Sequence, residues 1–240
     1  MSKSTRSKNI SKLIILALVL FVPGFLYILV NNMGSNEYLK LPVFGEKSLS
    51  GKMNRVMGRE IPDTIFHQVK PLDLVDLNGN EVPFLKSDTV ISVVHLFYSR
   101  DSALSKQLIH DLSSIAERFK DNPKVRLYSI SVDPRDTKAD LERQVLPYKK
   151  IGNRNWFVVF KPKEDILNYA REELLIEGMV NPADSSRYII GSNFVLLDSK
   201  RRIRGIYDIS LKTETARLED EIKVQLVEEI RNNPLKVERK

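Results

Sequence analysis

The stretch HLFYSRDSALSKQLIHDL, residues 95–112, decides how this chain is organised. It continues an apolar run over residues 89–98 that is rich in β-branched and aromatic residues. Such a run is typical of a central strand that is buried on both faces. After a short polar turn, Leu104, Leu108 and Leu112 recur at the spacing of one helix face. We therefore expect a buried strand that passes through a tight turn into a helix over residues 103–119.

The same kind of pattern continues along the chain in both directions. Two short strands flank the turn signal Asn78-Gly79, and a second central strand covers residues 124–134. Residues 155–160 predict a short strand, and residues 193–198 and 202–208 predict a hairpin. Helices are expected after a cap at Asp136 or Thr137, over residues 163–175 and over residues 214–233. This alternation predicts the α/β class, with a central mixed sheet between helices.

The amino-terminal region differs in composition from the rest. Residues 13–30 form an uncharged run that is long enough to span the hydrocarbon core of a membrane. Basic residues precede this run and no acidic residue does, which places the first residues inside the cell. We favour an uncleaved anchor over a cleaved signal peptide or a buried helix. The expected organisation is a cytoplasmic tail (1–12), a transmembrane anchor (13–30), a linker (31–60) and an exported domain (61–235).

Composition limits the chemistry. The chain has 240 residues and no cysteine, so disulfides, thiolate nucleophiles and cysteine-based metal sites are excluded. The formal net charge is +7, and four of the basic residues lie within the first twelve positions. Because the excess charge is a terminal cluster and not a stripe on the domain, we expect no nucleic-acid partner.

Three local strings resemble one known family. They are DTIFHQVKPLDLVDLNGNEV (63–82), SISVDPRDT (129–137) and NFVLLDSKRRIRGIYD (193–208). In this order and spacing they are similar to the Sco/SenC family of thioredoxin-like copper chaperones for cytochrome c oxidase assembly. The resemblance covers about residues 38–232. It implies a thioredoxin-like fold in its membrane-anchored bacterial form.

The resemblance also locates the family's copper ligands. The family carries a Cys-x-x-x-Cys-Pro motif after the first central strand and a histidine before the final hairpin. These positions fall on Asp101, Ser105 and Ile190; a register shifted by one residue would place Arg100 and Leu104 there instead. We prefer the first register because serine is nearly isosteric with cysteine. None of these residues suits copper, which favours soft sulfur and imidazole ligands. We expect no catalytic residue, no metal ligand and no cofactor.

Other polar residues have ordinary explanations. His67, His95 and His110 show no metal-ligand spacing. Asp133 follows a central strand and is expected to cap the turn at Pro134, or else to bind the loop after Arg100. Either Asp101 or Ser102 is expected to be the N-cap of the helix that follows.

Two hypotheses from different classes follow. The first is a non-catalytic Sco-like protein, not an enzyme, on the outer (periplasmic) face of the cytoplasmic membrane. It would act through contact with a protein, either a cysteine-bearing Sco protein or an oxidase subunit. The second is a residual thioredoxin-like enzyme or metal-binding protein that uses His95, Asp101, Ser105 or Asp133. We favour the first, because the scaffold resembles the family while all three ligand positions have changed.

Overall fold

The structure, a computed structural model, describes residues 4–33, 40–56, 59–86, 89–162 and 166–232. The chain divides into two compact units, residues 1–39 and residues 40–240. All three hydrophobic clusters of the core lie in the second unit. A unit with its own core is able to fold independently, so residues 40–240 can be studied as a domain.

The first unit consists of one helix, α1 (Ser4–Met33), with Pro23 inside it. Its apolar side chains are exposed, as at Leu20 and Phe21. Within the described part of the chain, no helix reaches the length and apolarity that crossing a membrane requires. Leu13 and Val30, the ends of the predicted anchor, lie outside the residues whose side chains are described.

The second unit begins with a hairpin in the segment that was expected to be a linker. β1 (Lys47–Val56) pairs antiparallel with β2 (Arg59–Phe66). The segment predicted as a linker, residues 31–60, therefore contains β1 and the start of β2. Leu49 and Met53 on β1 are exposed, as is Ile65 on β2. No hairpin residue whose side chain is described belongs to a core cluster. A strand is usually recognised by the alternation that packing on a core imposes, and these residues do not have that packing.

A seven-stranded mixed sheet forms the centre of the domain, in the order β11-β10-β5-β6-β7-β3-β4. The strands are β3 (Leu74–Asp76), β4 (Glu81–Val82), β5 (Ile91–Phe97), β6 (Val125–Ser131), β7 (Trp156–Phe160), β10 (Asn193–Leu197) and β11 (Ile203–Asp208). β5, β6 and β7 are parallel, and all other pairs are antiparallel. The predicted mixed sheet and each of its strands are confirmed.

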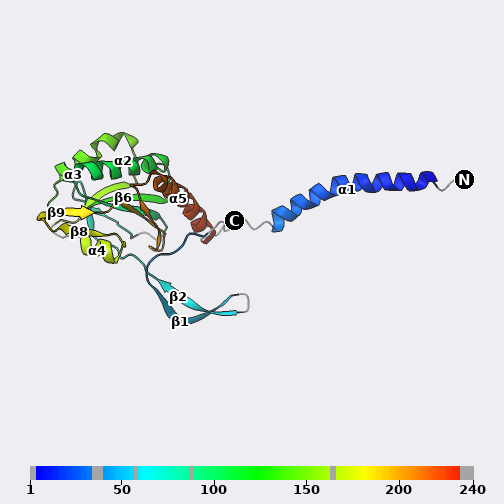
Figure 1. The fold of residues 1–240 in the computed structure, drawn as a ribbon, viewed down its shortest axis with the longest axis horizontal. Coiled ribbons are helices and arrows are strands. Elements are labelled where there is room, and N and C mark those ends of the chain that lie inside the picture. The colour runs from blue at the N-terminus through cyan, green and yellow to red at the C-terminus, as the bar shows by residue number, and fades with distance from the viewer. Residues whose placement is uncertain (1–3, 34–39, 57–58, 87–88, 163–165, 233–240) are drawn as a thin grey trace, which may run out of the picture. The chain divides into compact units, whose positions relative to one another are not determined.

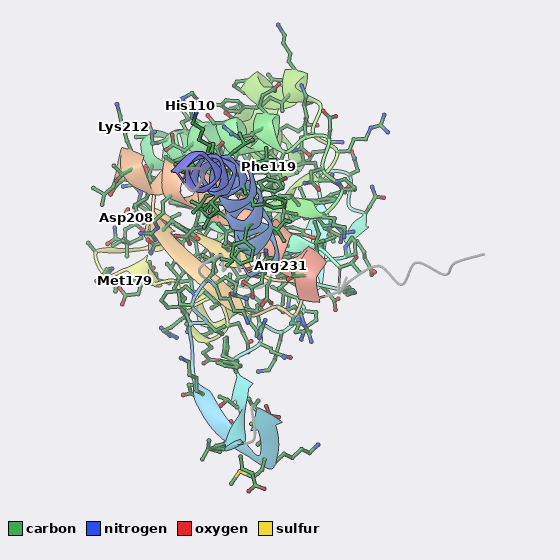
Figure 2. All side chains as sticks on the ribbon, turned by 90° about the vertical axis from the view of Figure 1, so that its right-hand side faces the viewer. His110, Phe119, Met179, Asp208, Lys212 and Arg231 are labelled. Carbon is green, nitrogen blue, oxygen red and sulfur yellow. The ribbon has the colours of Figure 1, made fainter. Side chains whose placement is uncertain are left out.

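Helices cover both faces of the sheet (Figure 1). They are α2 (Ser102–Arg118), α3 (Lys138–Val145), the 3-10 helix η1 (Leu146–Ile151), α4 (Leu167–Glu172) and α5 (Lys212–Asn232). α4 is shorter than the helix predicted over residues 163–175, of which residues 163–165 lie outside the described chain. Lys212 and Arg231 mark the two ends of α5 in Figure 2.

The central strand explains why both faces are covered. Every residue of β5 is buried. Val93 packs in the cluster that contains α2 and α5, whereas Val94 packs in the cluster that contains α4. Successive side chains of a strand point to opposite faces, so a continuous apolar run needs helices on both sides.

A second hairpin was not predicted. β8 (Gly178–Asn181) pairs antiparallel with β9 (Asp184–Ile190) as a separate two-stranded sheet. It lies beside α4 (Figure 1). Its carboxyl end, Ile190, leads almost directly into β10, which brings the hairpin close to the turn that follows β5.

Candidate functional site

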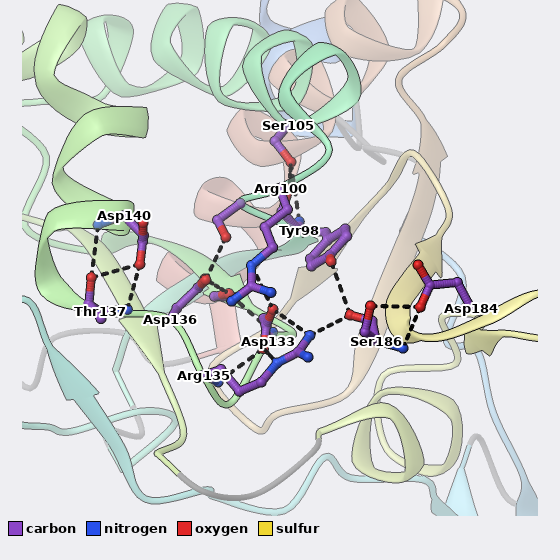
Figure 3. Close-up of polar contacts among 12 residues, drawn as sticks. Tyr98, Arg100, Ser105, Asp133, Arg135, Asp136, Thr137, Asp140, Asp184 and Ser186 are labelled. Atoms are coloured by element: carbon purple, nitrogen blue, oxygen red, sulfur yellow. Dashed lines mark hydrogen bonds and ion pairs between the residues drawn. The ribbon is translucent and has the colours of Figure 1, made fainter.

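A side chain of α2, Ser105, holds the turn between β5 and α2. The hydroxyl of Ser105 donates to the main-chain carbonyl of Tyr98 at 2.5 Å and accepts from the amide of Tyr98 at 3.2 Å. Ser105 is fully buried. Both functions of its hydroxyl are therefore used to hold the turn, as Figure 3 shows.

Asp101 is the N-cap of α2. The sequence predicted either Asp101 or Ser102 for this role, and the first is confirmed. Its carboxylate accepts from the amide of Leu104 at 3.5 Å, and its carbonyl accepts from the amide of Ser105. Its side chain is exposed at the start of the helix. A carboxylate in this position stabilises the first turn, whose amide groups lack helical partners.

The structure brings two of the three expected ligand positions to one hollow. Asp101 and Ile190 line the same open pocket of about 380 Å³, together with Tyr98, Arg100 and Tyr188. We call it the turn pocket. Ile190 is almost completely buried at the end of β9, so it gives the pocket an apolar wall. Ser105 lies behind Tyr98 and does not line the pocket.

Asp133 combines the two roles that the sequence left open. Its carboxylate accepts from the amide of Arg135 at 3.0 Å, which caps the turn, and binds the guanidinium of Arg135 at 2.8 Å. Arg100 also approaches it, with Nε 3.4 Å from Oδ2. Burial raises the pKa of Asp133, but the hydrogen bonds from Arg135 and the charges of both arginines outweigh it and lower the pKa overall.

Asp136 does not cap α3, although it was one of two candidates. The N-cap is Thr137, which forms a capping box with Asp140. Asp136 is buried, and its carboxylate accepts from the hydroxyls of Ser99 and Ser131, each at 2.5 Å. Burial raises its pKa more than these hydrogen bonds lower it. Asp136 therefore ties the turn after β5 to the end of β6.

Arg135 connects this network to the β8–β9 hairpin. Its guanidinium donates to the carbonyl of Ser186 at 2.5 Å, and the hydroxyl of Tyr98 donates to the same carbonyl at 3.4 Å. The rings of Tyr98 and Tyr188 pack edge to face at 5.4 Å. Figure 3 shows these contacts converging on Ser186. The hairpin is thus held against the turn by two residues of the loops that follow β5 and β6.

An apolar patch adjoins the turn pocket on the hairpin. Leu175, Met179 and Ile189 line one hollow with Ile190, which also lines the turn pocket. Met179 and Ile189 are paired across the hairpin and are 54% and 47% exposed. Leu175, Met179 and Ile189 are called the hairpin patch below; Met179 is labelled in Figure 2. Sequence reasoning missed this patch because the hairpin itself was not predicted.

The histidines do not join this site. His95 is fully buried in β5, with Nε2 2.7 Å from the hydroxyl of Ser129 and Nδ1 3.2 Å from the carbonyl of Leu96. Burial lowers its pKa to about 3, although the hydrogen bond with Leu96 opposes the shift. His67 contacts the carbonyl of Glu173, and His110 lies near the hydroxyl of Tyr148. None of the three histidines lines the turn pocket.

Comparisons with known proteins identify the fold. No protein-family model matches the chain, and no curated protein sequence matches it either. Solved structures do match. A SCO1/SenC family lipoprotein from Bacillus anthracis str. Ames is 15% identical, with a TM-score of 0.58, over 66% of this chain and 95% of that one.

Two further structures agree. BsSco, described as a member of the Sco family of cytochrome c oxidase assembly proteins, is 18% identical over 67% of this chain and 94% of its own, with a TM-score of 0.57. Bradyrhizobium japonicum ScoI with copper bound is 19% identical over 66% of this chain and 99% of its own, with a TM-score of 0.50. At these identities the likeness establishes the fold, which is the thioredoxin-like fold of Sco proteins.

The residues at the turn do not fit a copper ion. The positions implied by the resemblance hold an exposed capping carboxylate, a hydroxyl engaged with the main chain and an apolar side chain. Soft thiolate ligands select Cu(I), and imidazole suits Cu(II). The chain has no cysteine. Among the described residues, no group of three histidine or acidic side chains is arranged to hold a metal.

Proposed function

We propose that this chain is a divergent relative of the Sco proteins that acts by protein–protein contact, without catalysis and without copper. The observation that carries the proposal is the replacement at the turn. Asp101 and Ser105 serve the helix and the turn, and Ile190 closes the pocket with an apolar wall. The face of the scaffold that surrounds the turn is kept, while the chemistry that the family performs there has no residues to support it.

The hairpin patch is the proposed contact surface. Large apolar side chains that gather on a surface mark interaction sites, whereas scattered ones need no explanation. Leu175, Met179 and Ile189 line one hollow next to the turn pocket. The hairpin is positioned by Arg135 and Tyr98 through Ser186. A surface that is fixed before binding loses less conformational entropy on association.

The proposed partner is a protein of respiratory oxidase assembly, either a cysteine-bearing Sco protein or an oxidase subunit. The support is the shared fold, since BsSco is described as belonging to a family of cytochrome c oxidase assembly proteins. We further propose that residues 13–30 anchor the chain in the cytoplasmic membrane with the domain outside. The support is the uncharged run and the basic residues before it.

The test is crosslinking in cells with the tagged full chain, followed by affinity capture and mass spectrometry. The double variant Met179→Ser, Ile189→Ser removes the hairpin patch. Ile230→Ser is the matched control, since Ile230 is equally exposed but lies on α5. We expect oxidase subunits or a Sco protein with the unmodified chain and the control, and their loss with the double variant.

Other outcomes would contradict the proposal. Capture of unrelated envelope proteins, with oxidase subunits absent, would mean that the fold serves a different process. Tight binding of Cu(I) by residues 40–240 in competition with a chelator would contradict the copper-free part. Labelling of engineered cysteines in the domain only after cell lysis and membrane disruption would contradict the outward orientation.

A further inference from the structure

A second pocket lies between the β3–β4 turn, η1 and β7, with a volume of about 320 Å³. Its walls include Leu77, Val145, Tyr148, Trp156 and Val158, and Lys149 lies at its rim. We call it the tryptophan pocket. It shares no residue with the turn pocket or the hairpin patch. An inference about it is therefore independent of the proposed function.

The aromatic walls of the tryptophan pocket are held in place from behind. The indole Nε1–H of Trp156 donates to the hydroxyl of Ser129 at 3.0 Å, and that hydroxyl lies 2.7 Å from Nε2 of buried His95. The ring of Tyr148 lies 6.2 Å from the ring of Trp156 at an angle of 46°. These contacts fix the walls before any ligand binds, which favours binding because little ordering remains.

Most polar groups that line the pocket are already engaged. The carboxylate of Asp76 accepts from the amides of Asn78 and Asn80. The side-chain amide of Asn153 donates to the carbonyl of Ala116 at 2.8 Å. Lys149 is exposed, and it forms no ion pair with any residue that the structure describes. Its ammonium group is the cation among the residues that line the pocket, and the carboxylate of Asp76, which accepts hydrogen bonds from Asn78 and Asn80, is the anion.

We propose that the tryptophan pocket binds a small planar aromatic carboxylate. The ring would lie against Tyr148 and Trp156, and the carboxylate would face Lys149. The volume is at the lower end of the range of ligand pockets, which suits one or two fused rings. Aromatic walls bind planar rings by stacking or edge contacts, and the cation at the rim selects an anion over a neutral ring.

The chain offers a sharp test because Trp156 is its only tryptophan. The indole N–H of residues 40–240 gives a single nuclear magnetic resonance signal, which is followed while 2-naphthoate is added. We expect a saturable shift of this signal. The neutral analogue 2-naphthalenemethanol should bind about fivefold more weakly, the effect of one exposed charge pair. Calorimetry gives the same affinities independently.

Two variants assign the carboxylate contact. Lys149→Gln should weaken 2-naphthoate about fivefold and leave 2-naphthalenemethanol unchanged. Lys150→Gln is the matched control, because Lys150 is the exposed neighbour of Lys149 in η1 and does not line the pocket. The Lys150→Gln variant should bind 2-naphthoate with the same affinity as the unmodified domain. Both substitutions are on the surface, and thermal unfolding verifies that the variants are folded.

Three results would overturn the proposal. The first is an indole signal that does not move up to about 5 mM 2-naphthoate, which would mean no useful affinity. The second is equal affinity for 2-naphthoate and 2-naphthalenemethanol. The third is tighter binding of a peptide that ends in phenylalanine than of 2-naphthoate, which would reassign the pocket to the end of a partner protein.

Discussion

The hydroxyl of Ser105 donates to the carbonyl of Tyr98 at 2.5 Å, so the first turn of α2 is tied to the end of β5 by a buried side chain. In the register we prefer, this is one of the positions at which the resemblance implies a copper-binding cysteine. A residue that is nearly isosteric with cysteine thus serves the architecture of the turn. In this structure the side chain at this position binds its own main chain.

Ser105→Ala should destabilise the domain by about 1–2 kcal/mol, because it leaves the amide of Tyr98 without its hydroxyl partner and removes one of the two donors to the carbonyl of Tyr98, the other being the amide of Asp101. Chemical denaturation of residues 40–240 measures the free energy of unfolding. Ser114→Ala, on the exposed side of the same helix, is the control and should change it by less than about 0.5 kcal/mol. Equal effects of the two substitutions would contradict the role assigned to Ser105.

His95 should make the domain less stable as the pH falls below 6.5. Burial lowers its pKa from 6.5 to about 3, so between these values the unfolded chain binds a proton that the folded chain does not. Stability therefore rises with pH over this window, and unfolding at pH 5 should be easier than at pH 7 by about 2 kcal/mol. His95→Gln should remove most of this difference, whereas His110→Gln, at an exposed site, should keep it.

The sequence predicted the sheet and helices wherever burial imposes a pattern. β5 is buried along its whole length and reads as an apolar run, and α2 presents Leu108 and Leu112 to the core at helical spacing. β1 escaped prediction because Leu49 and Met53 face solvent. The start of β9 is polar and exposed, and it pairs only with β8. Hydrophobic periodicity reports packing against a core and not the strand conformation itself.

The candidate site was predictable only where neighbouring residues in the sequence determine it. The cap at Asp101 follows from local helix chemistry, so the sequence was sufficient. The meeting of Asp101 with Ile190 came only from the resemblance, since they are far apart in the sequence. The contact of Arg135 with Ser186 depends on the β8–β9 hairpin, which the sequence pattern did not reveal.

Arg204 should be indispensable for stability. It is 1% exposed, and its guanidinium binds the carboxylates of Asp198 and Glu228 and the carbonyls of Leu41 and Pro42. Arg204→Met takes the guanidinium away from Glu228 and leaves Asp198 with Arg202 as its counter-charge, and it should cost about 3–5 kcal/mol. The measurement is chemical denaturation, supported by faster proteolysis near residue 41.

A surface ion pair provides the control for Arg204. Arg118 pairs with Glu219, and the side chain of Arg118 is 54% exposed. Arg118→Met should cost less than about 1 kcal/mol, since exposed pairs contribute little. A loss of stability with Arg204→Met as small as that with Arg118→Met would mean that the contacts of Arg204 with Leu41 and Pro42 do not stabilise the domain.

Asp133→Asn should loosen the β8–β9 hairpin. The carboxylate orients Arg135, which donates to the carbonyl of Ser186. Loss of the charge weakens that orientation, so amide hydrogen exchange should accelerate in β9 while β5 remains protected. Because the pKa of Asp133 is lowered in the fold, its carboxylate stays ionised through the ordinary aspartate value of 3.8, and the unmodified domain should show the same loosening only as the pH falls below that value. Exchange in β9 that is equal in the two proteins at neutral pH would contradict this coupling.

Placing the family's copper ligands at the positions that the resemblance implies tests the register that we prefer. The triple variant Asp101→Cys, Ser105→Cys, Ile190→His should bind a single Cu(I) ion per chain, since Asp101 and Ile190 already line one pocket and Ser105 starts the next turn of α2. Competition with a Cu(I) chelator measures the affinity. The shifted variant Arg100→Cys, Leu104→Cys, Ile190→His should bind more weakly, because Leu104 packs against two core clusters and its replacement removes those contacts. Tighter binding by the shifted variant would favour the register in which Arg100 and Leu104 take the positions of the family's cysteines.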